Sequence, residues 1–393
     1  MMLPWFLILA CVLLTSPTLA GDDRNAAAGK ALFERVWVSS SSATRSDSGL
    51  GPLYDAPSCN SCHVAGGPGQ QSQEIGSGYV VRLGSTEGAP DPNYGFQLQT
   101  HALAGLQPES VVKIDWALRG EWRITRLALS DLPFGPLDPN TNAALRRAPS
   151  LAGIAELAAI SDDEILSHAA LEISRGGTGH VALLKDHKGK FAIGRWGWKA
   201  ATSDLGAQIA LAMQRDMGLS TTLHPQPWGE CTAAEQACRR AARRKERKVD
   251  APDAVRNLLV AYLTSIPAPI PMNTAAPGFA VFQRIGCDAC HATLKSRNGA
   301  DVWAMSDLLL HDMGPDLYDG IAEGAAKPSE WRTAPLWTIV EELAGGGLLH
   351  DGRARNIAEA VHWHGGEAAP ARTKYEGLNG TERGQLDAFL LQR

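Results

Sequence analysis

Two copies of the pattern Cys-x-x-Cys-His constrain this chain of 393 residues more than any other feature. In this pattern the two thiols can form thioether bonds to the vinyl groups of a haem, and the adjacent histidine can ligate its iron. A zinc site or a redox dithiol is the weaker interpretation, because zinc needs a second ligand pair nearby and a dithiol does not need the histidine. The sequence therefore predicts two covalently bound haem c groups, with Cys59, Cys62 and His63 holding the first and Cys287, Cys290 and His291 the second.

The N-terminus predicts export from the cytoplasm. An apolar run from Leu3 to Leu14 is too short to span a bilayer, and charged residues begin at Asp22. We interpret residues 1–20 as a cleaved signal peptide, which predicts a periplasmic protein with no further membrane span. An uncleaved anchor is the alternative, because no Lys or Arg precedes the apolar run, and Cys11 is a second alternative as a lipoprotein acceptor.

The remaining cysteines and the charged residues indicate less about function than the two Cys-x-x-Cys-His motifs do. In an oxidising compartment Cys231 and Cys238 are expected to form a disulfide. The net charge of −5 gives no sign of nucleic-acid binding. A basic run over residues 239–248 is interpreted as a solvated helix face, with a docking patch for an acidic electron donor as the alternative.

An internal repeat predicts the fold class. A helix is expected before each haem motif, and apolar residues at helical spacing predict a closing helix after each one. We therefore predict a mainly α protein of two cytochrome c-type helical haem domains, joined at the proline-rich residues 267–271. The expected domains are residues 21–270 and 271–393. The first is larger, and the alternating segment Val111–Leu129 predicts a β-hairpin inserted in it.

Several longer motifs carry a family resemblance. They are Ile193–Ala200 (IGRWGWKA), Asp216–Gly218 (DMG), Asp307–Gly314 (DLLLHDMG), Glu330–Trp337 (EWRTAPLW) and Leu349–Ala354 (LHDGRA). In these segments the chain resembles bacterial di-haem cytochrome c peroxidases and their MauG-like relatives, and most closely the di-haem oxidoreductase family, which is also labelled thiol oxidoreductase. The thiol label would require catalytic roles for Cys231 and Cys238, and nothing in the sequence places them near a haem.

His364 is the candidate second ligand of the second haem. Helical spacing puts it on the apolar face of Ile357 and Val361, whereas His362 points away. The corresponding position holds a methionine ligand in the peroxidases and a tyrosine in the MauG-like relatives, so the resemblance implies that His291 and His364 ligate one iron. Such a haem has a lower potential than its peroxidase counterpart. A core histidine bonded to a propionate is the alternative, and Met313 is the rival ligand.

The first haem is expected to have an open or weakly ligated iron. No histidine follows His63 until His101, whereas peroxidases with a saturated first haem carry one soon after the motif. Tyr79 and His101 are the alternative ligands. An iron with an open position can bind peroxide or oxygen, and a saturated iron can only transfer electrons.

Asp216 and Trp196 are the candidate catalytic residues. On a helix expected over Leu205–Met217, Asp216 falls on the apolar stripe, where an ionised carboxylate is costly and where acid/base groups are often found. The resemblance implies that Trp196 carries electrons between the haems and that Asp216 replaces a catalytic glutamate. A helix-end or arginine-paired carboxylate is the alternative for Asp216, and core packing is the alternative for Trp196 and Trp198.

Together these patterns predict a periplasmic di-haem enzyme that reduces hydrogen peroxide or a similar small oxidant. Asp216 would transfer the proton, and a small electron-donor protein would supply the electrons. Two alternatives stay open: a di-haem electron carrier without catalysis, and a MauG-like oxidase that acts on a partner protein.

Overall fold

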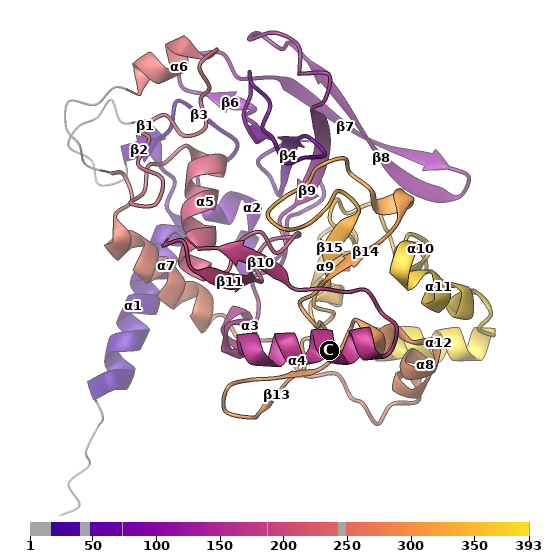
Figure 1. Ribbon diagram of the computed structural model, residues 1–393. Helices are drawn as coiled ribbons and strands as arrows, with labels where there is room; N and C mark the ends of the chain where they lie inside the picture. Colours follow the sequence, from indigo (N-terminus) through magenta and orange to yellow (C-terminus); the bar gives the residue numbers. More distant parts are fainter. Residues whose placement is uncertain (1–16, 40–47, 73, 187, 243–248, 393) are drawn as a thin grey trace, which may run out of the picture.

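The computed structural model describes residues 17–39, 48–72, 74–186, 188–242 and 249–392 (Figure 1). The longer helices are α1 (Pro17–Glu34), α4 (Asp162–Ser174), α5 (Leu205–Met217), α7 (Asp253–Ser265), α8 (Pro277–Ile285), α11 (Ala369–Glu376) and α12 (Gly380–Leu390). The shorter ones are α2 (Cys59–Cys62), α3 (Ile154–Ala159), α6 (Gln236–Ala241), α9 (Ile339–Ala344) and α10 (Ile357–His362). Turns of 3-10 helix lie at Val64–Gly66, Cys287–Ala289, Pro315–Leu317 and Gly366–Ala368.

The strands form several small sheets. The central strand β4 (Tyr79–Gly84) pairs with β5 (Gln97–Leu98) and β9 (Asn142–Arg147) in an antiparallel sheet. Strands β7 (Val111–Arg119) and β8 (Trp122–Ser130) form a hairpin. The other pairs are β1 (Val38–Ser39) with β2 (Ser48–Leu50), β3 (Leu53–Tyr54) with β6 (His101–Ala102), β10 (Ala182–Lys185) with β11 (Phe191–Gly194), β12 (Leu294–Lys295) with β13 (Asp301–Val302), and β14 (Leu310–Asp312) with β15 (Glu330–Arg332).

The prediction of a mainly α, cytochrome-type fold is wrong. The protein is 34% helical and 20% strand. The strands escaped prediction because most are two to six residues long and many pair across large sequence distances, as Tyr79 of β4 does with Arg147 of β9. Alternation over so few residues gives no periodic signal. The hairpin expected within Val111–Leu129 is present, because its strands are long and adjacent along the chain.

A helix pair accompanies each Cys-x-x-Cys-His motif. Helix α1 packs on α7 in the first half, and α8 packs on α12 in the second. Both crossings need a glycine: a Cβ atom on Gly29 would lie 2.0 Å from the Leu258 carbonyl oxygen, and one on Gly278 would lie 2.0 Å from that of Gln385. The repeat in the sequence therefore corresponds to two similar close helix contacts. The division near residue 270 stays a prediction.

The inserted hairpin joins the two halves of the chain. In Figure 1 the purple strands β7 and β8 lie close to the orange and yellow C-terminal segments. The Arg123 guanidinium of β8 donates hydrogen bonds to the carbonyl oxygens of Arg353 (2.7 Å) and Gly352 (2.5 Å). The Thr125 hydroxyl donates to Asp351 (2.7 Å). Within the described residues, no helix is long and apolar enough to cross a membrane.

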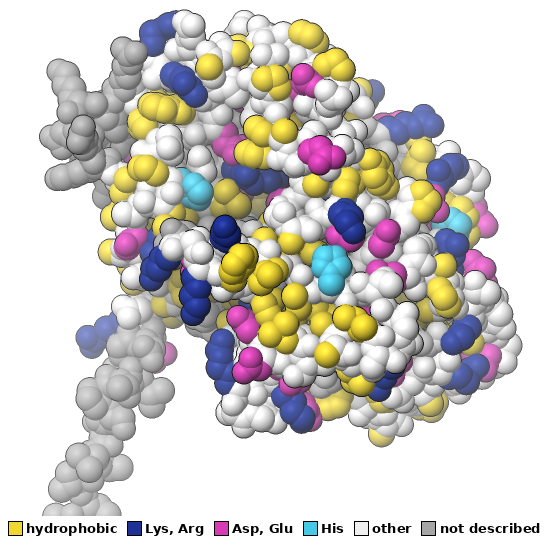
Figure 2. Space-filling model, in the orientation of Figure 1, with side chains coloured by type: hydrophobic (Ala, Val, Ile, Leu, Met, Phe, Trp, Pro, Cys, Tyr) yellow, Lys and Arg dark blue, Asp and Glu magenta, His cyan; other side chains and the backbone are white. Residues whose placement is uncertain are grey.

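The surface carries charges of both signs. On the face in Figure 2, acidic and basic side chains are interspersed with apolar ones. This mixture agrees with the small net charge of −5. Of the basic run over residues 239–248, positions 243–248 lie outside the described residues.

Candidate functional site

One cavity of about 970 Å³ is lined by the cysteines and histidines of both motifs. Helix α2 carries the first motif and begins after Ser58, whose hydroxyl accepts the Ser61 backbone N–H (3.1 Å). The second motif follows Gly286, which ends α8 with a φ of +89°. This volume lies at the upper end of the range of roughly 300–1,000 Å³ for ligand sites. In the folded chain both motifs therefore border the same cavity.

The two motif histidines are held in the same way. The Nδ1 atom of His63 lies 3.0 Å from the Pro149 carbonyl oxygen, and that of His291 lies 3.0 Å from the Met305 carbonyl oxygen. A carbonyl only accepts, so each Nδ1 donates and the lone pair is on Nε2. Desolvation lowers the pKa of both imidazoles to about 4, so both are neutral at neutral pH. A neutral imidazole oriented through its Nδ1–H is the usual form of an iron or zinc ligand.

His364 repeats this arrangement opposite the second motif. Its Nδ1 atom donates to the Ala360 carbonyl oxygen (2.6 Å), and desolvation lowers its pKa. His364 lines the cavity and lies close enough to His291 that a charge on it would lower the pKa of that residue. By contrast, His362 stacks on Trp122 and is not a lining residue. Met313 also lines the cavity, so the structure brings both candidate ligands of the second site to it.

Buried donor groups around the cavity fit a haem. Tyr79 Oη, Arg147 Nη2 and Trp337 Nε1 have no hydrogen-bond partner among the described residues, and all three residues line the cavity. A buried donor without an acceptor is costly, and the propionates of a haem are acceptors. With a thiol pair and a neutral imidazole in each motif, the residues present fit two haem groups.

The thiols of the motifs do not resemble a redox dithiol. Desolvation raises the pKa of Cys59, Cys62 and Cys287 to about 12, and it also raises that of Cys290. Reactive dithiols have a lowered thiol pKa. The redox-dithiol interpretation therefore gains no support from the site.

Asp216 lies beside the first motif. It is in the last turn of α5, which begins after Asp204, whose side chain accepts the Ala207 N–H (2.8 Å). The Asp216 carboxylate faces the cavity, and its charge raises the pKa of Cys59 and Cys62. Burial raises the pKa of Asp216 itself. Among the described residues Asp216 forms no ion pair, so the arginine-paired alternative is not what the structure contains. Its place in the last turn of α5 agrees with the helix-end alternative.

Sequence reasoning missed the partners of Asp216. Gln97 Nε2 donates both to Asp216 Oδ1 (2.8 Å) and to Asp55 Oδ2 (2.9 Å). Arg82 Nη1 in turn donates to Gln97 Oε1 (3.1 Å). Asp55 is 1% exposed, and burial raises its pKa to about 7. Gln97 and Asp216 are 119 residues apart, so no local pattern could have linked them.

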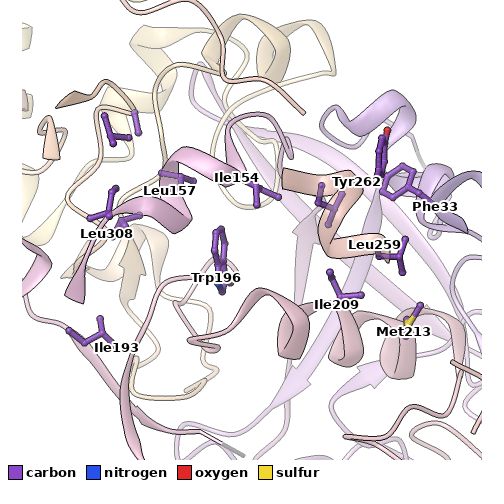
Figure 3. Close-up of a cluster of buried hydrophobic side chains, with 14 of the residues drawn as sticks. Phe33, Ile154, Leu157, Ile193, Trp196, Ile209, Met213, Leu259, Tyr262 and Leu308 are labelled. Atoms are coloured by element: carbon purple, nitrogen blue, oxygen red, sulfur yellow. The ribbon is translucent and has the colours of Figure 1, made fainter. Parts of the chain in front are cut away.

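Trp196 belongs both to the core and to the cavity wall. It is 7% exposed and follows β11, among Ile154 and Leu157 of α3 and Ile209 of α5 (Figure 3). Trp198 also lines the cavity, and its Nε1 donates to the Arg147 carbonyl oxygen (2.7 Å). Both tryptophans therefore fill space and contact the site.

The alternative ligands of the first site are placed differently. Tyr79 lines the cavity. His101 does not; its exposed ring stacks on Tyr54, with centroids 5.6 Å apart. Cys231 and Cys238 form the expected disulfide, and neither lines the cavity. The thiol-oxidoreductase interpretation thus lacks a link to the site.

His311 is a further residue at the second motif that sequence reasoning did not single out. Its Nε2 lies 2.9 Å from Asp307 Oδ2 and its Nδ1 lies 3.0 Å from Glu367 Oε2. These carboxylates raise the pKa of His311 despite its burial, so it is positively charged. Its Nδ1 is 3.6 Å from Cys290 Sγ. A protonated imidazole paired with carboxylates therefore lies beside the second motif.

The family described as "Di-haem oxidoreductase, putative peroxidase" matches residues 144–392. The chain belongs to this family. No significant match was found among curated proteins or solved structures. Membership implies that this di-haem oxidoreductase binds haem, as the cavity also indicates.

The family match covers only part of the candidate site of this di-haem oxidoreductase. It contains Trp196, Asp216 and the second motif. The first motif and the residues behind Asp216, namely Asp55, Arg82 and Gln97, precede residue 144. Their assignment therefore depends on the geometry of this chain and not on the family match.

Proposed function

We propose that this di-haem oxidoreductase is a periplasmic enzyme that reduces hydrogen peroxide and carries two covalently attached haem c groups. The observation that supports this most is the shared cavity, in which a thiol pair and a neutral histidine from each motif accompany Asp216. Cys59 and Cys62 would attach the first haem, with His63 as ligand. Cys287 and Cys290 would attach the second, with His291 and His364 as ligands.

A haem bound at the first motif supplies an iron that accepts peroxide, and a haem at the second supplies a relay for electrons. Hydrogen peroxide takes up two electrons and two protons and yields two water molecules. The electrons come from a small electron-donor protein. Residues of the chain must therefore deliver the protons to peroxide and carry the electrons between the two sites.

Asp216 is the proposed acid/base residue. It faces the cavity beside Cys59 and Cys62, and its raised pKa keeps a proton available at higher pH than an exposed aspartate would. Its side chain is short, but Gln97 holds one carboxylate oxygen at 2.8 Å and so limits its orientation. In the proposed cycle Asp216 delivers a proton to the leaving oxygen.

Trp196 is the proposed electron path between the two sites. It is aromatic, nearly fully buried and on the wall of the shared cavity. Packing against Ile154, Leu157 and Ile209 keeps the indole in one position. An oxidisable aromatic ring in the wall of the shared cavity would offer an electron an intermediate step between groups bound at the two motifs.

Haem content and peroxide turnover of the purified protein test the proposal. A pyridine haemochrome assay should return two haems per chain, and Cys290→Ala should leave one loosely held. Peroxide should be reduced at the expense of a reduced donor protein, and the resting ferric protein should show both a high-spin and a low-spin signal. Only low-spin haem with negligible turnover would instead indicate an electron carrier. Slow turnover of small donors with a minutes-long oxidised state would indicate an oxidase of a partner protein.

A further inference from the structure

A row of hydrogen bonds leads from the cavity to the surface behind Asp216. Gln97 Nε2 connects Asp216 Oδ1 (2.8 Å) to Asp55 Oδ2 (2.9 Å). The other oxygen of Asp55 accepts the Thr100 hydroxyl (2.9 Å) and the Thr100 backbone N–H (3.0 Å). The Thr100 hydroxyl oxygen lies 3.2 Å from Nδ1 of His101, whose side chain is exposed.

We propose that Asp55 supplies protons to Asp216 and that Thr100 and His101 connect Asp55 to the solvent. This inference rests on the proposed peroxide reduction. Asp55 would act only through Asp216, so it is a positioning and proton-supplying residue and not a catalytic one.

The direction of the hydrogen bonds suits inward proton transfer. Thr100 has one hydroxyl hydrogen, and it points to Asp55. The contact between Thr100 and His101 therefore needs His101 Nδ1 as the donor. A proton taken up by the exposed imidazole can pass to the Thr100 oxygen as the Thr100 hydrogen passes to Asp55.

Gln97 holds the carboxylates of Asp55 and Asp216 at a separation that suits proton transfer through one water molecule. Because Arg82 donates to Gln97 Oε1, the Nε2 group must face Asp55 and Asp216. Two oxygens that accept from the two hydrogens of one amide lie roughly 5 Å apart, a gap that one water molecule can bridge. The backbone adds to this alignment, because the Asp55 N–H donates to the Asp216 carbonyl oxygen (2.8 Å).

The surroundings of Asp55 favour a stored proton. It is 1% exposed, and burial together with the charge of Asp216 on α5 raises its pKa to about 7, against the hydrogen bonds from Thr100 and Gln97. Glu109 and the Cys62 thiol are the other titratable groups near enough to sense its charge. The nearest cation linked to it by hydrogen bonds is Arg82, which contacts it only through Gln97.

The proton balance of a full cycle requires that Asp216 be protonated again. Each peroxide consumes two protons and two electrons, and Asp216 can hold only one proton at a time. After Asp216 has released its proton, Asp55 would return one to it through a water molecule that joins the two carboxylates beside Gln97. Asp55 is then refilled through Thr100 from His101 and the solvent.

The decisive experiment compares Thr100→Val with Thr100→Ser in the protein that carries both haems. Valine has the shape of threonine without the hydroxyl, and serine restores the hydroxyl. Steady-state peroxide turnover should fall by about tenfold in Thr100→Val and in Asp55→Asn, less than the roughly 10²–10⁴-fold expected for a direct acid/base group. Thr100→Ser should recover most of the loss. The first reaction with peroxide in stopped flow should stay within about twofold of the parent, because Asp216 is intact.

Chemical rescue and infrared titration complete the test. Turnover of His101→Ala should fall and should recover when imidazole is added, which a purely structural role would not produce. A carboxyl C=O band that disappears as the pH rises through neutrality should be present in the parent and missing in Asp55→Asn. Equal turnover of parent, Thr100→Val and Asp55→Asn, or a parent without this band, would overturn the proton path and leave the proposed function standing. A parent that has the band but does not reduce peroxide would overturn the proposed function itself, and the path with it.

Discussion

Trp122 of the inserted hairpin stacks on His362 of α10, with ring centroids 3.9 Å apart and an angle of 13° between the rings. His364 lies two residues further along and faces the cavity. The hairpin therefore packs against the outer side of α10, and His364 faces the cavity just after this helix. This contact links an insertion in the first half of the chain to the segment that carries His364.

Removal of the hairpin contact should loosen this segment. Trp122→Ala removes the stacked ring and should lower the free energy of unfolding by roughly 1–3 kcal/mol, as expected for a half-buried aromatic pair. Thermal unfolding of the haem-loaded protein measures this loss of stability. The matched control is Leu118→Ala, which removes an exposed side chain (58%) of the same hairpin and should change stability little. Equal effects of both changes would argue against a supporting role of the stack.

His364→Ala should open the second iron and raise the high-spin fraction of the ferric protein, because the imidazole opposite His291 is lost. His362→Ala should change the spin state little, since His362 does not line the cavity. His364→Met should raise the potential of this haem, because a thioether stabilises the ferrous state relative to imidazole. Absorption and electron paramagnetic resonance spectra decide between the two histidines, and identical spectra for both alanine variants would contradict the assignment.

Asp216→Asn should lower the rate of the peroxide reaction by about two to four orders of magnitude without change in haem content. Burial raises the pKa of Asp216, so its acid form persists to higher pH than that of an exposed aspartate. The parent rate should therefore fall as the pH rises through this raised pKa, and Asp216→Asn should lose that dependence. An unchanged pH profile in the variant would show that another group supplies the proton.

Trp196→Phe keeps an aromatic ring that is harder to oxidise. It should slow the sharing of oxidising equivalents between the haems while the first reaction with peroxide stays nearly normal. Stopped-flow spectra separate these steps. Trp198→Phe is the control: it removes the hydrogen bond from Nε1 to the Arg147 carbonyl and should lower stability without slowing electron sharing. If oxidising equivalents pass between the haems equally fast in both variants, Trp196 has no special part in the electron path.

The stability of the protein should depend on Asp55. Burial raises its pKa from 3.8 to about 7, so the folded state keeps a proton that the unfolded chain releases between these pH values. Stability should accordingly fall as the pH rises from about 4 to 7, by at most about 4 kcal/mol from this residue. Asp55→Asn should flatten the dependence in denaturant titrations, whereas Asp115→Asn, at an exposed position of β7, should leave it unchanged.

Features that are encoded over a few neighbouring residues could be predicted before the fold was known. Each Cys-x-x-Cys-His motif spans only five neighbouring residues, so both motifs could be recognised without knowledge of the fold. Helical periodicity separated His364, which lines the cavity, from His362, which stacks outside it. The hairpin of β7 and β8 and the disulfide of Cys231 with Cys238 join segments adjacent along the chain, and both are present.

The other features became visible only in the folded chain, because they depend on contacts between distant segments. The short strands that make the protein α and β pair across long stretches of chain, as β4 does with β9, and a two- to six-residue strand carries too few alternations to be recognised. Likewise, Asp55, Gln97 and Asp216 come from three separate segments, and only folding places one amide between two carboxylates. Local sequence patterns record which residues a segment buries, but they do not record which distant segment it meets.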